Sequence, residues 1–288
     1  MIKVNKINEI KEDVRCPKCM KIVSFTGNAG DVIKVTCPAC GTVGKVTFRK
    51  PEYIIEAENV HKVYTTGKIQ VNALRGVNLR IKKGEMVTLM GVSGCGKTTL
   101  LNCLSGLDEV TDGVIKIEGK ELNKMSDDEK TEYRGIRMGF IFQFYNLLPV
   151  LSAVENVELP LLISREKPNI ARERALKSLE MVGLKGWEFH KPAELSGGQR
   201  QRVTIARSLV CNPLIVFGDE LTGDLDRETA DEIMNIICRL NKEQKLTFVL
   251  VTHDSNLARE HARIIYSIKD GKVESVEKKI KGKWTKVR

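Results

Sequence analysis

The feature that most constrains this 288-residue chain is a glycine-rich stretch between an apolar run and a helix-like segment. Residues 91–99 read Gly-Val-Ser-Gly-Cys-Gly-Lys-Thr-Thr, which is the spacing of a P-loop. The apolar run 85–90 predicts a buried strand, and residues 98–104 predict the opening of a helix. Backbone N–H groups in such a turn, together with the helix N-terminus, bind phosphate oxygens. The stretch therefore predicts a nucleoside triphosphate site at the end of a strand.

Each position of this stretch has an expected part in binding. The side chain of Lys97 is expected to reach the outer phosphates, and the hydroxyl of Thr98 to ligate Mg²⁺. The cradle for the nucleotide is expected to include Gly91, Ser93, Gly94, Cys95, Gly96 and Thr99. A P-loop by itself indicates only nucleotide binding, so the reaction must be inferred from other motifs.

Two carboxylates follow a second apolar run. Residues 214–218, bounded by Pro213, predict a central parallel strand that ends at Asp219 and Glu220. Carboxylates at the ends of such strands lie on the ligand side of an open α/β sheet. We expect Asp219 to hold Mg²⁺ and Glu220 to polarise the water that attacks the γ-phosphate. The alternative, an acidic pair that only caps a strand, is disfavoured by the P-loop.

Three further motifs give the chain a resemblance to a known family. Residues 195–199 read Leu-Ser-Gly-Gly-Gln, Gln143 precedes them, and His253 follows an apolar run. With these motifs, the sequence over about residues 52–275 resembles the ATP-binding cassette (ABC) ATPase family. The resemblance implies an α/β P-loop NTPase cassette with a mainly parallel core sheet flanked by helices, an antiparallel β subdomain and a helical subdomain. It also implies that the nucleotide is ATP and that ATP is hydrolysed to ADP and phosphate.

The resemblance identifies residues 195–199 as the signature sequence, which closes over the nucleotide bound by a second subunit in this family. A serine, two glycines and the N-terminus of a helix expected over 200–210 form an anion-binding end, in agreement with that role. Contacts to the nucleotide are thus expected from Ser196, Gly197, Gly198 and Gln199. Two copies of the chain are expected to dimerise head to tail around two ATP molecules.

Four isolated residues gain roles from the same resemblance. Gln143 matches the residue that contacts Mg²⁺ and the attacking water and relays to a membrane partner. Asp226 ends the D-loop motif, and His253 matches the histidine that senses the γ-phosphate. Tyr64 matches the aromatic residue that stacks on adenine. The alternatives are a core aromatic for Tyr64 and an ordinary loop histidine for His253.

Three segments of the sequence resemble one subfamily of the ABC ATPases in particular. Residues 142–149, 153–160 and 222–226 are similar to the subfamily that powers lipoprotein release and macrolide export, in which the partner is a separate membrane subunit. The family pattern is broken by Cys95 in place of Ser, Leu221 in place of Pro and Asp224 in place of Asn. Position 95 contributes backbone, so we expect ATP binding to survive. The other two changes bear on the stiffness of the D-loop rather than on the chemistry.

Four cysteines near the start of the chain indicate a metal site. Cys16 and Cys19, and then Cys37 and Cys40, form two Cys-Pro-x-Cys pairs with the spacing of a tetrahedral zinc site. Alternating runs around them predict short strands, and together these features predict a small N-terminal β zinc ribbon. About fifty residues bury little core, so zinc would supply folding free energy of about 10–16 kcal/mol. We expect a structural metal; the alternative is a catalytic or redox role.

The net charge of +10 is confined to the two ends. Residues 1–50 carry +6 and residues 269–288 carry +5, whereas residues 51–268 carry −1. Basic ends can contact anionic lipid or nucleic acid, or can simply be solvated. An alternative function, a soluble ABC ATPase acting on nucleic acid, the ribosome or a cluster-assembly partner, rests on these ends and the cysteines. A single cassette without sustained heptads before the signature argues against that alternative.

We expect three regions along the chain: a zinc ribbon over 1–50, an ABC ATPase domain over 51–275 with a helical subdomain at about 126–190, and a basic tail over 276–288. Within the subdomain, Ser126 and Glu129 predict a capped helix start, and residues 171–182 predict a further helix. Residues 147–151 are expected either to line a groove for a partner helix or to pack in the core. The ribbon could also dock on the cassette and regulate it.

Two features of the sequence indicate where in the cell the protein works. No apolar run approaches the roughly 18 residues of a membrane span. The other four cysteines are scattered singly, which favours a reducing cytosol. We therefore expect a cytoplasmic subunit, peripheral on the inner face of the cell membrane, that uses ATP, Mg²⁺ and Zn²⁺. Its expected partner is a separate integral-membrane permease subunit, with nucleic acid the less favoured partner.

Overall fold

Short apolar runs form the parallel centre of a seven-stranded sheet. The computed structural model describes residues 9–28, 30–48 and 53–287 and gives the strand order β10-β11-β12-β7-β13-β14-β15. The central strands β7, β11 and β12 are buried on both faces, which explains why their sequences are nearly continuous apolar runs. The strands are β10 (Met138–Ile141), β11 (Ile215–Asp219), β12 (Thr247–Thr252), β7 (Met86–Met90), β13 (Ile264–Lys269), β14 (Lys272–Ile280) and β15 (Lys283–Lys286).

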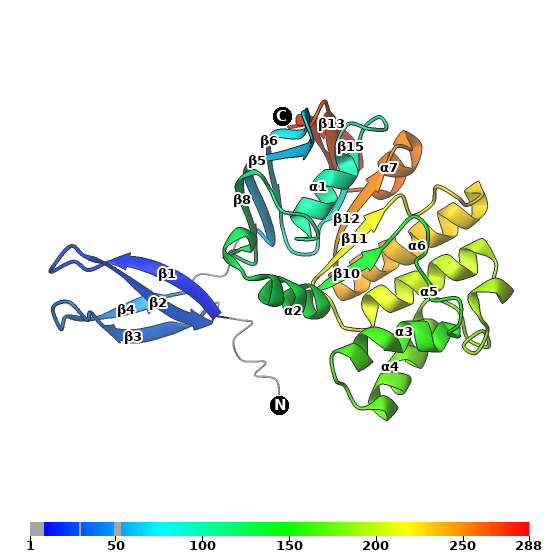
Figure 1. Cartoon of the computed structure of the whole chain (residues 1–288), viewed down its shortest axis with the longest axis horizontal. Helices are drawn as coiled ribbons and strands as arrows, with labels where there is room; N and C mark the ends of the chain where they lie inside the picture. Colours follow the sequence, from blue (N-terminus) through cyan, green and yellow to red (C-terminus); the bar gives the residue numbers. More distant parts are fainter. Residues whose placement is uncertain (1–8, 29, 49–52, 288) are drawn as a thin grey trace.

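Alternate side chains of the central strands point into two separate cores. Ile215 and Phe217 of β11 belong to one apolar cluster, and Val216 belongs to the other. Helices contribute to both clusters, so the sheet is covered on both faces (Figure 1). The first cluster includes α1 (Lys97–Leu104), and the second includes α5 (Gly197–Leu209) and α6 (Arg227–Gln244). This packing fixes the ends of β7, β11 and β12, where the predicted site residues lie.

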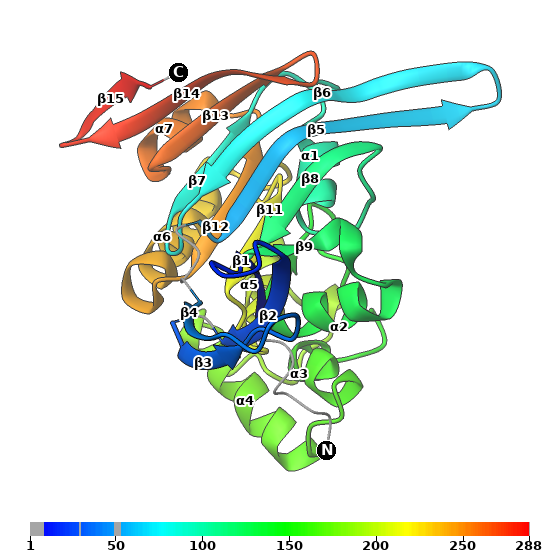
Figure 2. The ribbon, with the colours of Figure 1, turned by 90° about the vertical axis from the view of Figure 1, so that its left-hand side faces the viewer.

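A second, antiparallel sheet lies over α1 (Figure 2). Its buried side chains, including those of Ile55 and Leu79, share the first core with Leu100 of α1. The strand order is β6-β5-β8-β9, with β6 (Ile69–Ile81), β5 (Ile55–Thr66), β8 (Asp112–Ile117) and β9 (Lys120–Glu121). The antiparallel β subdomain implied by the resemblance is therefore present.

The region expected to be mostly helical contains three helices and one strand. Helix α2 begins after Ser126, whose hydroxyl and Glu129 form the predicted capping box. Residues 138–141 are strand β10 rather than helix, because they pair in parallel with β11. Close packing favours this arrangement, since a Cβ on Gly139 would lie 2.4 Å from the Ser208 carbonyl oxygen. The helical elements are α2 (Asp127–Arg137), α3 (Ala153–Ile163), α4 (Pro168–Met181), η2 (Leu122–Lys124) and η3 (Pro192–Glu194).

The four-cysteine region consists of two antiparallel hairpins, as its alternating runs predict. β1 pairs with β2 and β3 pairs with β4, while Phe48 is fully buried against them. Backbone N–H groups of Met20 and Gly41 donate to the carbonyls of Cys16 and Cys37, both at 2.9 Å, so the two cysteine turns have the same bonding. The strands are β1 (Glu9–Arg15), β2 (Ile22–Asn28), β3 (Val32–Thr36) and β4 (Val43–Thr47).

The segment expected as a basic tail differs in the structure. Residues 272–286 form β14 and β15, which continue the main sheet in antiparallel order. Val276 is buried in the first core, and Trp284 packs beside α7 (Ser255–His261), where its indole N–H donates to the Arg259 carbonyl at 3.3 Å. Apolar side chains between the lysines pack against the core and keep this segment in the sheet, although its positive charge suggested an exposed tail. Among the described residues, no helix is both long and apolar enough to cross a membrane.

Candidate active site

The P-loop runs between β7 and α1 in close contact with neighbouring backbone. Gly96 has a φ of 101°, and a Cβ there would lie 2.6 Å from the Ala73 carbonyl oxygen. At Gly91 a Cβ would lie 2.3 Å from the Ile268 carbonyl oxygen. Only glycine fits both places. Lys97 is buried at the centre of the loop, where its ammonium donates to the carbonyls of Gly91 and Val92, both at 2.9 Å.

The first residue after the lysine meets the end of β11. The hydroxyl of Thr98 donates to Oδ1 of Asp219 at 3.2 Å, although the two residues are 121 positions apart. Burial raises the pKa of Asp219, and the hydrogen bond from Thr98 partly offsets this. A hydroxyl and a carboxylate beside a phosphate cradle are the oxygen ligands that Mg²⁺ prefers, so this donor set fits the predicted cation.

The second carboxylate and the predicted histidine form a pair at the ends of adjacent strands. Oε1 of Glu220 lies 3.2 Å from Nδ1 of His253. Glu220 has a φ of 44°, and its backbone N–H donates to the Val251 carbonyl at 3.1 Å. Left-handed backbone in a residue other than glycine is uncommon and clusters at functional sites. The pair is accessible, since the His253 side chain is 62% exposed.

Gln143 belongs to the same group of residues. A Cβ built on Gly223 would lie 3.6 Å from Nε2 of Gln143 and 3.7 Å from Oε2 of Glu220. Gly223 is therefore close to both side chains. Asp226, three residues later, caps α6 by accepting hydrogen bonds from the backbone and hydroxyl of Thr229, at 3.0 and 2.7 Å. Its carboxylate is thus engaged within the chain.

The signature residues lie at a helix start, three residues earlier than the sequence predicts. Ser196 caps α5 through a capping box in which its N–H donates to Gln199 at 2.9 Å, and the N–H of Gln199 donates back to the Ser196 hydroxyl at 3.2 Å. The glycines allow close packing, since a Cβ on Gly198 would lie 2.5 Å from Thr229 of α6. The structure joins these residues to α6 and joins the P-loop to β11.

Tyr64 lies on β5 at the edge of α1 and is not a core aromatic, since it is 40% exposed. Its hydroxyl donates to Oδ2 of Asp108 at 2.6 Å. The ammonium of Lys62 lies 4.8 Å from the centre of the Tyr64 ring. Partial burial and Asp108 raise the pKa of Tyr64 to about 12, while the hydroxyl of Thr99 lowers it, which shows that the ring adjoins the P-loop helix.

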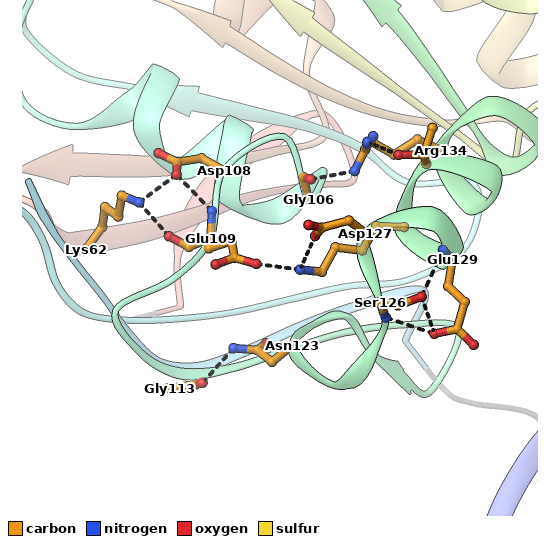
Figure 3. A network of polar contacts seen from close by, with 12 residues as sticks. Lys62, Gly106, Asp108, Glu109, Gly113, Asn123, Ser126, Asp127, Glu129 and Arg134 are labelled. Carbon is orange, nitrogen blue, oxygen red and sulfur yellow. Dashed lines mark hydrogen bonds and ion pairs between the residues drawn. The ribbon is translucent and has the colours of Figure 1, made fainter.

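Lys62 and Asp108 are part of this arrangement and are missed by the sequence motifs. The Lys62 ammonium donates to Oδ1 of Asp108 at 2.5 Å and to the Glu109 carbonyl at 2.7 Å (Figure 3). Burial raises the pKa of Asp108, but hydrogen bonds from Lys62 and Tyr64 outweigh this and lower it. Lys62 could have been suspected, because it lies two residues before Tyr64 on one strand face. Nothing local to position 108 indicates its role.

The four predicted zinc ligands come together in the two hairpins. Sγ of Cys16 lies 3.6 Å from that of Cys40, and Sγ of Cys19 lies 3.8 Å from that of Cys37. Zinc–sulfur bonds of about 2.3 Å at tetrahedral angles separate the sulfurs by about 3.8 Å, so the donor set fits the metal. Hydrogen bonds from Thr42 lower the pKa of Cys40 to about 6, whereas burial and the neighbouring cysteines raise the pKa of Cys19 to about 11.

Comparisons with known proteins agree with this geometry. A family model described as ABC transporter matches residues 74–223. Over 229 residues the chain is 48% identical to the ABC transporter ATP-binding protein MJ0796 of Methanocaldococcus jannaschii, covering 78% of this chain and 97% of that protein. It is 47% identical over 222 residues to the lipoprotein-releasing system ATP-binding protein LolD of Pseudoalteromonas translucida, covering 77% of this chain and 95% of LolD.

A solved structure shows the same similarity in three dimensions. It is the dimeric structure of a post-hydrolysis state of the MJ0796 cassette bound to ADP and Pi, with a TM-score of 0.72 at 45% identity. The match covers 98% of that chain and 78% of this one. These relatives are thus matched almost whole, while about a fifth of this chain lies outside the match.

Proposed function

This chain belongs to the ABC transporter family as an ATP-binding subunit, and we propose that its P-loop, β11 and β12 together hydrolyse ATP to drive a separate membrane subunit. The similarity to lipoprotein-releasing ATP-binding proteins supports this function and does not favour a soluble ATPase acting on nucleic acid or ribosomes. One observation carries the proposal: the contact between Thr98 and Asp219 lies beside the pair of Glu220 and His253, so three distant segments supply the parts of one hydrolytic site.

In the proposed mechanism, water attacks the γ-phosphorus while the bond to the bridging oxygen breaks. Lys97 would exchange its two backbone carbonyls for phosphate oxygens. Glu220 would orient the water and accept its proton, and His253, held at Nδ1 by Glu220, would direct Nε2 to the γ-phosphate. Gln143, next to Glu220 across Gly223, would hold the water and Mg²⁺. Thr98 and Asp219 would hold Mg²⁺, which would neutralise charge on the phosphates.

The test of this mechanism is the Glu220→Gln variant of the full chain. Loss of the general base is expected to lower kcat at least about a hundredfold while ATP still binds, because the amide keeps the size of the side chain. ATP should then hold the variant as a dimer in size-exclusion chromatography. Glu243→Gln, at an exposed position of α6, is the control and should hydrolyse ATP normally. Normal turnover by Glu220→Gln would exclude Glu220 as the base.

Two copies would complete each site. The signature residues Ser196–Gln199 are joined to α6 rather than to the P-loop, so a second copy would supply them head to tail across the nucleotide. The N-terminus of α5 suits contact with a phosphate, because its N–H groups and dipole favour anions. The dimeric structures of the MJ0796 cassette support this arrangement. In it, Tyr64, braced by Asp108, would stack on the adenine.

A groove beside Gln143 would receive the membrane partner. It is lined by Phe140, Phe142, Pro160 and Arg207, among others, and exposed Val150 lies near it along the chain. The guanidinium of Arg207 donates to the backbone carbonyls of residues 145 and 146, at 2.8 and 2.6 Å, and so ties this loop to α5. Movement at the nucleotide would therefore reach the groove. Such a subunit would work at the cytoplasmic face of the membrane, where ATP is available.

We assign residues 1–50 to a structural zinc ribbon and residues 51–275 to the cassette. The sulfur separations in the cluster of Cys16, Cys19, Cys37 and Cys40 support zinc binding. The small number of buried residues around the cluster supports a need for metal to stabilise the fold. Four thiolates leave no open coordination position, which favours a structural metal over a catalytic one. The relatives matched almost whole leave about a fifth of this chain unmatched, which supports treating the ribbon as an added domain.

A further inference from the structure

His261 lies at the end of α7 with an unsatisfied ring nitrogen. Its side chain is 9% exposed, and its Nε2 is buried without a hydrogen-bond partner. Its other nitrogen, Nδ1, lies 3.6 Å from Sγ of Cys238 on α6. Buried polar atoms in proteins nearly always have a partner, so the Nε2 atom requires an explanation.

Two carboxylates lie close to this histidine. Oδ1 of Asp231 lies 3.9 Å from Nε2 of His261, and one potential ligand atom from each of Asp231, Glu260 and His261 lies within 4.8 Å of the others. Asp231 and Cys238 are seven residues apart on α6, so they lie on the same helix face, two turns from each other. The imidazole thus rests against that face with Nδ1 toward the sulfur and Nε2 toward the carboxylates.

The separation of these atoms fits a bridging metal ion better than a direct hydrogen bond. A hydrogen bond between Nε2 and Asp231 would require about 2.7–3.2 Å, well below the observed 3.9 Å. Two metal–ligand bonds of about 2.0–2.2 Å at a tetrahedral angle would separate the ligand atoms by about 3.3–3.6 Å, which is within a few tenths of an ångström of the observed distance. When Nδ1–H donates to Cys238, Nε2 keeps a lone pair for ligation.

We propose that Asp231, Glu260 and His261 form a second metal site, distinct from the four-cysteine cluster, for a divalent first-row transition metal such as Zn²⁺. Imidazole and carboxylate ligands suit such ions, and three protein ligands leave an open coordination position. Cys238 fixes the ring from the other side as an outer partner. The bound ion would link α6 to α7, which follow Asp226 and His253 respectively.

The test is zinc binding by the full chain after saturation with one equivalent of Zn²⁺ and removal of the excess. Calorimetry is expected to show uptake of a further Zn²⁺ per chain, and zinc should raise Tm, because binding stabilises the folded state. His261→Ala and Asp231→Asn should each weaken this uptake at least tenfold and abolish the rise in Tm. His61→Ala, at a histidine on β5 outside the group, is the matched control and should bind as the unmodified chain does.

The variants separate this site from the cysteine cluster. Zinc uptake by the four cysteines would be unchanged in His261→Ala. The difference in zinc uptake between the unmodified chain and His261→Ala therefore measures binding at the new site. If His261→Ala fails to fold, Asp231→Asn decides, because the Asp231 side chain is already 40% exposed. The absence of further zinc uptake, or equal uptake by the unmodified chain and Asp231→Asn, would overturn the proposal.

Discussion

The four-cysteine region, which we propose to be a zinc ribbon, and the cassette hold their functional residues in opposite ways. Where burial is described between residues 13 and 48, only Cys16, Cys37, Val46 and Phe48 are buried. The cassette instead places two large apolar clusters on the two faces of its sheet. In the ribbon, two of the four buried residues are themselves proposed ligands, so binding and folding are one process. In the cassette, the site residues are placed by a core to which they hardly contribute.

Removal of zinc should give the largest difference between the two regions. A zinc-selective chelator, with Mg²⁺ kept in excess, is expected to unfold the ribbon, because a structural zinc supplies about 10–16 kcal/mol of its folding free energy. Limited proteolysis should then cut within residues 9–48 while ATP hydrolysis continues. A mock treatment with the zinc-loaded chelator is the control. A parallel loss of ATP hydrolysis that Asp231→Asn does not itself cause would contradict this separation and would instead indicate that the ribbon regulates the cassette.

A substitution that removes a core side chain of the cassette tests whether the cassette and the ribbon fold independently. Phe217 is 1% exposed in the centre of β11 and stacks on Phe140 at 5.8 Å between ring centres. Phe217→Ala is expected to lower the free energy of unfolding of the cassette by about 3–5 kcal/mol, measured by chemical denaturation. The zinc content of the ribbon should not change. Phe189→Ala, at a residue that is 70% exposed, is the control and should have little effect. A loss of zinc in Phe217→Ala would show that the regions fold together.

The smallest effect is expected at the edge of the nucleotide site. Asp108→Asn replaces a carboxylate that accepts hydrogen bonds from Lys62 and Tyr64. Loss of about 1 kcal/mol of bracing is expected to raise KM for ATP about fivefold with kcat nearly unchanged. The pKa of about 12 keeps the Tyr64 hydroxyl a donor throughout the assay range, so the effect should not depend on pH. Asp127→Asn, at a nearby exposed position, is the control; an unchanged KM in Asp108→Asn would rule out the bracing role.

The sequence predicted those parts of the fold whose pattern is local. Apolar runs predicted β7 and β11, and the comparisons confirm the cassette fold. The capped start of α2 at Ser126 was also predicted correctly. β10 was missed, because four residues within a helical region show no period of their own and become a strand only by pairing with β11. The basic tail was wrongly inferred from charge, since Val276 between the lysines is buried.

The candidate site, like the fold, contains some residues that local motifs predict and others that only packing places there. The P-loop, Asp219, Glu220 and His253 carry recognisable local motifs, and the structure brings Thr98 to Asp219 and Glu220 to His253. Asp108 could not be predicted, because its importance comes from a contact with a strand 44 residues earlier in the sequence. The position of Gln143 against Gly223 is likewise a product of packing.

The backbone hydrogen bond from Glu220 to Val251 has a consequence for timing. It fastens the turn that holds the proposed base to the strand that ends just before His253, and the two side chains are fastened to each other as well. In the proposed mechanism, base and sensor would therefore move together. A γ-phosphate that fails to engage the histidine would also leave the carboxylate out of line with the water, so an incompletely closed dimer would not hydrolyse ATP without doing work on its partner.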